Sequence, residues 1–502
     1  MSLYKTSKIV RFFIGISFVV SILKPVMGQE MLGLVNSNFA GSAGLSLNPS
    51  SLVNSKLYMD IHLLSGDIFA ENNYLYIHRQ DYRLFKMLGP NGDVPAYGKN
   101  NSMFDRFSNT ELKNAYMNIR LQGPSFMMVW GDHAFGFYTA ARSVLSLRRL
   151  PYEIPNFLYE GLEYDKQHNI NYVDKNFSLT NLEWAEFGLT YSTVIYQRAM
   201  DRFTAGITVK YLAGVTGGYM NVSEIDYIVL NDSTVNVNNL NTDIGFSLPV
   251  NYETNEAMLS DPLFKGRGFG VDLGMNYLRM KRGAQQSSFS RLCRQSYPDY
   301  YYKLGFSLID IGRIRFRENA RTYKFEDVNA YLRRLDTLNY YNLDQITGFL
   351  SEQFYGDPDA AVEGDEISIV LPSAFSAQFD YQFLPGWYVN STAVVPIPLG
   401  KARLHRPAQL SITPRFEHWL YEVSLPVSLY DMRYPRIGLA ARFAFLTVGT
   451  DKLGGFFGLS DFTGMDIYFA IKINFTKGRC PFSGRSTYCT NDEYGPIRKR
   501  RK

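Results

Sequence analysis

The sequence predicts an all-β fold, a transmembrane antiparallel β-barrel of about 14 strands with an N-terminal segment of small residues and long extracellular loops. Three observations lead to this prediction. Apolar and polar residues alternate along many segments, and many of these segments are about 9–11 residues long, the length that crosses a bilayer at a tilt. The chain also opens with the features of a secretory signal peptide.

Residues 1–28 are the predicted signal peptide. Basic residues precede the apolar run Phe12–Leu23, and Val26 and Gly28 are small enough for a signal-peptidase site. The alternative is a membrane anchor, but this run is shorter than the roughly 20 apolar residues of a spanning helix. Cleavage after Gly28 would leave Gln29 first. Because this residue is not Cys, a lipoprotein is not expected.

Residues 29–56 form a predicted lead segment before the first strand. Its central stretch, GSAGLSLNPSSL (Gly41–Leu52), is small and uncharged, and it neither alternates like a strand nor favours a helix. Asn48–Pro49 is expected to turn the chain toward the first strand. Small size would let the segment lie inside a crowded lumen as a plug. The alternative is a flexible periplasmic leader.

Residues 57–476 are the predicted barrel. In Phe269–Leu278 the odd positions from 269 to 277 are apolar, and the even positions before Leu278 are Gly, Asp or Asn. Successive strand side chains point to opposite faces, so such a segment has one apolar and one polar face. The same alternation marks Ala374–Phe383, Asp466–Phe475, Ala115–Leu121, Ala185–Ile195, Phe203–Ala213, Ala408–Phe416, Trp419–Leu429 and Ile437–Phe445. It is less regular in Leu57–Leu64, Asn73–His78, Phe126–Trp130, Phe135–Ala141, Tyr301–Phe316 and Trp387–Val395.

Charged residues on the polar faces are the candidate lumen-facing residues. They are Arg120, Glu186, Lys210, Asp272, Asp380, Arg415, Glu417, Glu422, Arg442 and Lys472. A soluble β-sandwich would place them in water, whereas a membrane barrel turns them into its lumen. The barrel is favoured because the strands are long and only 3 Cys occur in 502 residues. The charges are expected either to neutralise one another or to line a pore.

The connections also fit a barrel. Gln122–Pro124, Gly131–His133 and Arg198–Asp201 are predicted short turns. Arg79–Leu112, Ser143–Glu183, Asn231–Gly268 and Glu318–Glu366 are predicted long loops. Within the last loop, Phe325–Phe354 has helix-like spacing. It is expected to form short helices that cap or enter the barrel, or else a solvated loop.

The last predicted unit, residues 477–502, is a basic C-terminal extension. Cys480 and Cys489 are close enough in sequence for one disulfide, with Cys293 left over; the alternative is three free thiols. The net charge of +5 comes partly from the two ends of the chain, so no nucleic-acid partner is expected.

Residues 41–52 resemble the N-terminal lead of the FadL outer-membrane transporter family. The match covers Gly41, Gly44, Asn48 and Pro49, with Ser50 in place of the usual Ala. The resemblance implies a fourteen-stranded barrel with this segment as part of a plug. In that family a strand kink opens the barrel toward lipid, and Pro426, which cannot donate a ladder hydrogen bond, is the candidate kink here.

Two further segments resemble other outer-membrane barrels. Arg436–Phe475 is similar to the final strands of PorV-type proteins, and Leu371–Phe383 to a strand pattern that they share with the PorP/SprF group. Over Gln29–Phe475 the chain most resembles an uncharacterised family of Gram-negative outer-membrane barrels. It lacks the strongly apolar N-terminal hatch helix expected of a fatty-acid channel, so fatty acid is not the expected solute.

The resemblance implies an outer-membrane protein that passes a small solute, including a hydrophobic one. The alternative is a PorV-like barrel that scaffolds or shuttles partner proteins, so the expected partners are outer-membrane lipid, a hydrophobic small molecule, or a periplasmic or secreted protein. No enzyme, cofactor or metal site is predicted, because the six His show no HExxH spacing and no Gly-x-Ser-x-Gly frame occurs.

Overall fold

The structure is a computed structural model that describes residues 30–86, 95, 103–257, 262–281, 300–335 and 342–476. The predicted signal peptide, Cys293, the Cys480–Cys489 pair and the C-terminal extension lie outside the described residues. Within these residues, no helix is both long and apolar enough to cross a membrane.

The chain forms a closed antiparallel barrel of 14 strands, as predicted. Closure comes from pairing of the first strand with the last, in a register that sets Met59 opposite Phe475. In order, the barrel strands are β1 (Met59–Asn72), β4–β5 (Lys113–Gln122 and Ser125–Trp130), β6 (His133–Leu150), β7 (Asn171–Arg198), β8 (Asp201–Asn231), β10 (Gly266–Met280), β11 (Tyr300–Phe316), β14–β15 (Ile367–Val370 and Ala374–Leu384), β16 (Trp387–Pro396), β17 (Gln409–Glu417), β18–β19 (Tyr421–Ser424 and Val427–Tyr430), β20–β21 (Tyr434–Ile437 and Leu439–Phe443), β22 (Leu446–Thr450) and β23 (Gly464–Phe475).

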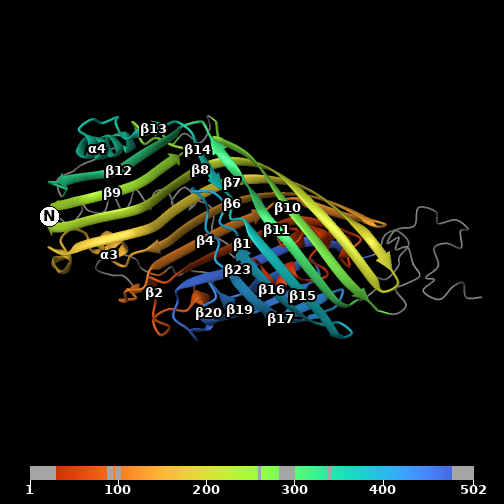
Figure 1. Cartoon of the computed structure of the whole chain (residues 1–502). Coiled ribbons are helices and arrows are strands. Elements are labelled where there is room, and N and C mark those ends of the chain that lie inside the picture. Colours follow the sequence, from red (N-terminus) through yellow and green to blue (C-terminus); the bar gives the residue numbers. More distant parts are fainter. Residues whose placement is uncertain are drawn as a thin grey trace, which may run out of the picture.

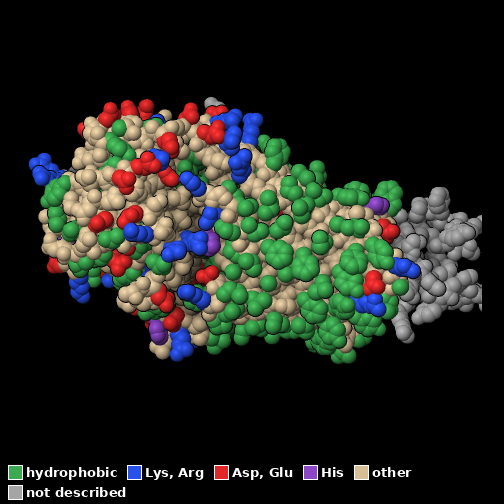
Figure 2. Space-filling view, viewed as in Figure 1, with side chains coloured by type: hydrophobic (Ala, Val, Ile, Leu, Met, Phe, Trp, Pro, Cys, Tyr) green, Lys and Arg blue, Asp and Glu red, His purple; other side chains and the backbone are tan. Residues whose placement is uncertain are grey.

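The strands turn apolar side chains outward and polar ones inward. Along β15, Phe375 and Phe379 are exposed on the outer face, while Ser376 and Asp380 are fully buried. Figure 2 shows the result, a barrel wall covered by hydrophobic side chains on the visible face. This arrangement is the reverse of a soluble protein and is typical of a wall that faces lipid.

One end of the molecule extends beyond this hydrophobic wall. β7 and β8 are 28 and 31 residues long, and the outer half of β8 leaves β10 to pair with β9 (Thr234–Ser247). β9 pairs with β12 (Ala320–Leu332), which pairs with β13 (Val362–Gly364). The helices α3 (Glu153–Glu160) and α4 (Leu343–Tyr355) lie beside these strands (Figure 1). We call this part the extension.

The extension revises the loop predictions. Ser143–Glu183 is largely strand from β6 and β7, and Asn231–Gly268 contains β9. Helix-like spacing in Phe325–Phe354 was correct only for its second half: α4 is a helix, but residues 325–332 belong to β12, where strand pairing with β9 overrides the local pattern. Within the predicted loop Arg79–Leu112, Asp105–Arg106 (β3) forms a short strand that pairs with Leu75–Tyr76 (β2), which precedes the loop.

Gln122–Pro124 is not a turn, contrary to the prediction. β4 and β5 run on in the same direction, and both pair with β1 on one side and β6 on the other. Gly123 and Pro124 interrupt the ladder because Pro has no backbone N–H to donate. The predicted turns at Gly131–His133 and Arg198–Asp201 do connect strands. They lie at the end opposite the extension, which we call the turn end.

Candidate functional site

The N-terminal segment, residues 31–57, lies inside the barrel. It contains α2 (Leu32–Val35), η2 (Gly41–Ser46) and η3 (Pro49–Asn54), and nearly all its residues are buried. η3 contacts β7, β8 and β10, η2 contacts β1 and β5, and α2 contacts β17 and β21, so strands surround the segment on all sides. Wall side chains alone fill a barrel of about 8 strands, and this wider lumen also holds a length of chain.

Asn48 and Pro49 begin the short helix η3. Asn48 is the N-cap, whose Oδ1 accepts a hydrogen bond from the Ser50 N–H at 3.0 Å, and Pro49 occupies the first helical position. The Asn48 Nδ2 donates to Gln378 Oε1 on β15 at 2.9 Å. It also lies 3.3 Å from Asn276 Oδ1 on β10. The Asn48 side chain therefore caps η3 and also contacts two strands of the wall.

Wall glycines make room for η3. A Cβ at Gly206 on β8 would lie 2.6 Å from the backbone of Pro49 and Ser50. A Cβ at Gly274 on β10 would lie 2.2 Å from the Asn48 side chain. These distances are far below van der Waals contact, so only glycine permits the segment to approach the wall this closely.

A buried ion network holds the segment near the turn end. Asn38 donates its backbone N–H to Glu417 Oε1 at 3.0 Å, and Lys56 Nζ lies 3.1 Å from Glu417 Oε2. Arg415 pairs with Glu417 at 2.8 Å and, through two hydrogen bonds, with Asp380. The wall charges thus bind both ends of residues 38–56.

Other inward charges contact the middle of the segment. Gly41 has a φ of +59°, and a Cβ there would lie 2.3 Å from the carboxylate of Asp60, which accepts from the Ser42 backbone N–H at 3.1 Å. Lys472 donates to the carbonyls of residues 39 and 40, the second at 2.8 Å. Glu422 accepts from Ser37 at 2.8 Å and from Arg442 at 3.2 Å.

A second ionic cluster, which we call the charged layer, lies across the lumen toward the extension. It consists of Arg120, Arg142, Glu186, Lys210, Asp272 and Asp310. Lys210 Nζ lies 2.7 Å from carboxylate oxygens of both Asp272 and Asp310, and Arg142 lies 3.0 Å from Asp310. The three cations and the three carboxylates balance, and each buried charge has a partner of opposite sign within the layer.

The lumen becomes apolar beyond the charged layer. We call this part the apolar layer, a cluster of buried inward side chains that includes Phe69, Tyr116, Val144, Leu182, Trp184, Leu212, Ile314, Phe316, Ile369, Leu371, Leu404 and Tyr430. The Arg142 guanidinium lies 4.7 Å from the Trp184 ring centroid, where the two layers meet. Leu404 belongs to the loop 397–408, which folds inward from the extension side.

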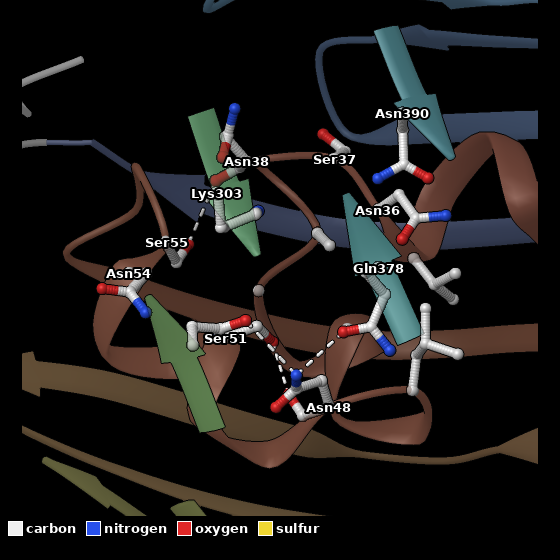
Figure 3. A pocket seen from close by; sticks show the side chains of 16 residues that line it. Asn36, Ser37, Asn38, Asn48, Ser51, Asn54, Ser55, Lys303, Gln378 and Asn390 are labelled. Atoms are coloured by element: carbon white, nitrogen blue, oxygen red, sulfur yellow. Dashed lines mark hydrogen bonds between the residues drawn. The ribbon is translucent and has the colours of Figure 1, made fainter. Parts of the chain in front are cut away.

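A small polar cavity remains between the segment and the wall (Figure 3). Its lining includes Asn48, Asn276, Lys303, Gln378 and Asn390. The cavity volume is about 30 Å³, which is enough for one or two water molecules. This cavity therefore has no room for a solute larger than water.

The ten charged residues predicted to face the lumen fall into the ionic groups described above. Arg120, Glu186, Lys210 and Asp272 lie in the charged layer, and the other six contact the segment or its partners. The prediction missed Arg142 and Asp310 in the charged layer, and Asp60 and Lys56 beside the segment. Asp310 has a φ of +56° beside a register shift, so the alternation that reveals inward residues changes phase at this position.

Pro426 separates β18 from β19. The strand does not leave the barrel there, because both halves pair with β17, and the Pro426 carbonyl accepts from the Gly438 N–H at 2.6 Å. Gly438 likewise separates β20 from β21. The kink is thus a shared break in two adjacent strands, and its proposed role in a lateral opening stays a prediction.

One group of side chains in the described residues has metal-ligand spacing. Asp165, His168 and Asp232 lie together in the extension, but both carboxylates are exposed, and His168 Nε2 lies 2.8 Å from the Leu162 carbonyl. Nothing in this arrangement points to a bound ion.

A family model described as a family of unknown function, DUF5723, matches residues 49–451. The chain belongs to this family. The matched range begins at Pro49, within the N-terminal segment, and includes most of the barrel and the extension. No curated protein matches the chain.

The solved structures that are similar to this DUF5723 chain include two toluene transporters and a FadL homologue. The Pseudomonas putida toluene transporter TodX is 11% identical, with 90% of this chain and 96% of that chain covered and a TM-score of 0.37. The Ralstonia pickettii toluene transporter TbuX is 9% identical, with 90% and 98% covered and a TM-score of 0.39. A Pseudomonas aeruginosa FadL homologue is 10% identical, with 90% and 99% covered and a TM-score of 0.28.

Proposed function

We propose that this protein is an outer-membrane channel that admits a small apolar solute and is closed by its N-terminal segment. The observation that carries the proposal is the layered lumen. An apolar layer lies toward the extension, and a hydrogen-bonded segment blocks the way to the turn end.

The outer surface supports placement in a membrane. Hydrophobic side chains cover the barrel wall on the visible face, and charged side chains are concentrated on the extension (Figure 2). A closed barrel satisfies all its wall hydrogen bonds within lipid. Because bacterial barrels have short periplasmic turns and longer outer connections, the turn end would face the periplasm and the extension would face outside.

The apolar layer defines the class of solute. A solute that enters from the extension side meets buried aromatic and aliphatic side chains from several strands and from the loop 397–408. Such a surface favours apolar molecules, because burial of apolar area gains about 25 cal/mol per Å² and unpaired polar groups lose free energy.

The N-terminal segment is the proposed gate. Hydrogen bonds and ion pairs join it to the wall at Asn38, Ser42, Asn48 and Lys56. Water can replace such contacts when the segment shifts. The resemblance of residues 41–52 to the FadL lead segment supports the same assignment.

Uptake of an apolar fluorescent probe tests the proposal. Cells that carry the protein in their outer membrane should take up N-phenyl-1-naphthylamine severalfold faster than cells with an empty vector. Leu404→Asp places a charge in the apolar layer and should return uptake to the vector level. Leu399→Asp, on the same loop but 38% exposed, is the matched control and should leave uptake unchanged.

Heat-modifiable gel migration would show that each variant assembles. Uptake by wild-type cells at the vector rate, or by assembled Leu404→Asp at the wild-type rate, would contradict the proposal. The other function considered from the sequence, a PorV-like scaffold for partner proteins, stays a prediction.

A further inference from the structure

A cluster of arginines lies on the outside of the barrel where the hydrophobic wall meets the extension. Arg267 on β10, Arg313 and Arg315 on β11, and Arg317 just after the end of β11 are all exposed. In the strand register Arg267 is directly opposite Arg315. Figure 2 shows basic side chains at the border of the hydrophobic region, near the place where β11 ends in Figure 1.

Toward the turn end, the outward-facing positions of β10 and β11 carry apolar side chains. Arg313 is paired in register with Phe269, which is 69% exposed and packs against Tyr211 on β8. Farther along, Leu273 pairs with Leu308. The arginines therefore begin where the lipid-facing surface ends.

The positive charge of this cluster is only partly neutralised. Glu366 pairs with Arg315 at 2.8 Å and with Arg317 at 2.9 Å. Among the described residues no ion pair reaches Arg267 or Arg313. Like charges directly opposite each other on neighbouring strands are destabilising, so the pair Arg267–Arg315 needs an anion that the chain itself does not fully supply.

We propose that Arg267 and Arg313, with Arg315, bind the phosphate of a lipid headgroup in the leaflet beside the extension. This inference rests on the membrane placement in the proposed function. Guanidinium groups bind phosphate through two parallel hydrogen bonds, and basic residues at a membrane surface attract anionic headgroups. A lipid whose acyl chains cover Phe269 and Leu273 holds its phosphate at the height of the arginines.

The site is tested on the full chain in phosphatidylcholine nanodiscs that contain diphosphorylated lipid A. Native mass spectrometry measures the lipid A that stays bound after transfer to detergent. Arg267→Gln/Arg313→Gln should lower retained lipid A about 10- to 30-fold, on the basis of about 1 kcal/mol per basic residue. Arg267→Lys/Arg313→Lys keeps the charge but not the paired hydrogen bonds and should give a smaller loss.

The matched control is Arg333→Gln/Arg433→Gln. Both residues are exposed, and their replacement removes the same charge but leaves Arg267, Arg313 and Arg315 in place. This variant should retain lipid A within twofold of wild type. If Arg267→Gln/Arg313→Gln retains as much lipid A as the wild type, the site is overturned. The site is also overturned if this variant and the control variant lose the same amount of lipid A.

Inorganic phosphate distinguishes a lipid site from a free-anion site. If millimolar phosphate displaces lipid A completely, the lipid assignment is overturned in favour of a simple anion site. Flotation with vesicles separates this inference from the proposed function. A wild-type protein that does not float overturns the membrane placement and the lipid site together, whereas floating variants with unchanged lipid A retention overturn only the site.

Discussion

At the scale of single residues, the lumen is organised by buried charges with several partners each. Glu417 accepts from the Asn38 backbone and side chain and pairs with both Arg415 and Lys56. Alternation along β17 predicts that Glu417 faces inward, but its partners come from residues 38 and 56, which no pattern connects to it. The direction of a side chain depends on its position along one strand, whereas its ion-pair partners depend on how distant segments pack together.

Glu417→Ala should destabilise the barrel by about 3–5 kcal/mol, because it removes a fully buried carboxylate that pairs with both Lys56 and Arg415 and accepts from Asn38. The free energy of unfolding in urea, measured in detergent micelles or lipid vesicles, checks this value. Glu224→Ala removes a more exposed partner of Lys175 and should cost less than about 1 kcal/mol. Similar losses in the two variants would contradict the assigned role of Glu417.

His405 gives a prediction for pH. Burial in the loop 397–408 is the main cause that lowers the pKa of His405 to about 4, with Arg148 and Arg403 as further causes. An unfolded His titrates near 6.5, so between about pH 6.5 and 4 the unfolded state binds more protons than the folded state. The stability from this group is present above about pH 6.5 and is lost, by at most about 3 kcal/mol, as the pH falls toward 4.

Hydrogen exchange of the loop 397–408 at pH 7 and pH 4.5 measures this effect. The loop of the wild-type protein should exchange faster at the lower pH, after correction for intrinsic rates. His405→Leu should remove most of the difference. A loop that is equally protected at both values in the wild type would contradict the prediction.

At the scale of elements, strand identity could be predicted from alternation, but strand length and branching could not. The outer halves of β7 and β8 alternate less clearly, because they leave the lipid-facing wall and pack within the extension. Residues 325–332 show helix-like spacing, yet β9 supplies a ladder that makes them a strand. Where a neighbouring element decides the structure, the local sequence is ambiguous.

At the scale of elements, the close packing of η3 on β8 gives a testable prediction. Gly206→Ala would bring a methyl group to 2.6 Å from the backbone of η3 and should displace the N-terminal segment from the wall. We expect a loss of about 1–3 kcal/mol in the free energy of unfolding. We also expect faster proteolysis within residues 31–57.

Gly218→Ala is the matched control for Gly206→Ala. It lies on the same strand, and the nearest atoms to its added Cβ are 3.7 and 3.8 Å away, which is ordinary contact. This variant should behave like the wild type. If Gly206→Ala is equally unaffected, then close packing of η3 on β8 does not hold the segment.

At the scale of the whole molecule, the N-terminal segment lies inside the barrel among strands of several walls, and we propose that it is the gate of the lumen. Replacement of residues 38–51 by a Gly/Ser sequence of equal length keeps the chain connected but removes the contacts of Asn38, Ser42 and Asn48. Planar-bilayer recordings should show steady conductance for this variant and almost none for the wild type. A variant that folds with wild-type stability and stays closed would contradict the proposed gate.

The sequence by itself determined the barrel. Side-chain direction follows from position along a strand, so a period of two with apolar residues outside and charges inside is written into each segment separately. The same local pattern placed Asp272, Asp380 and Arg415 on inward faces. The Asn48–Pro49 pair likewise marked a local turn before any contact was known.

Only the tertiary structure decided what fills the lumen and where it is closed. The close approach of η3 to Gly206 and Gly274, the pairing of Arg142 with Asp310, and the assembly of the apolar layer all join residues that are far apart in sequence. Barrel closure fixes these distances, because it brings inward faces from all 14 strands around one enclosed space. A period read along one strand contains no information about the strand on the opposite wall.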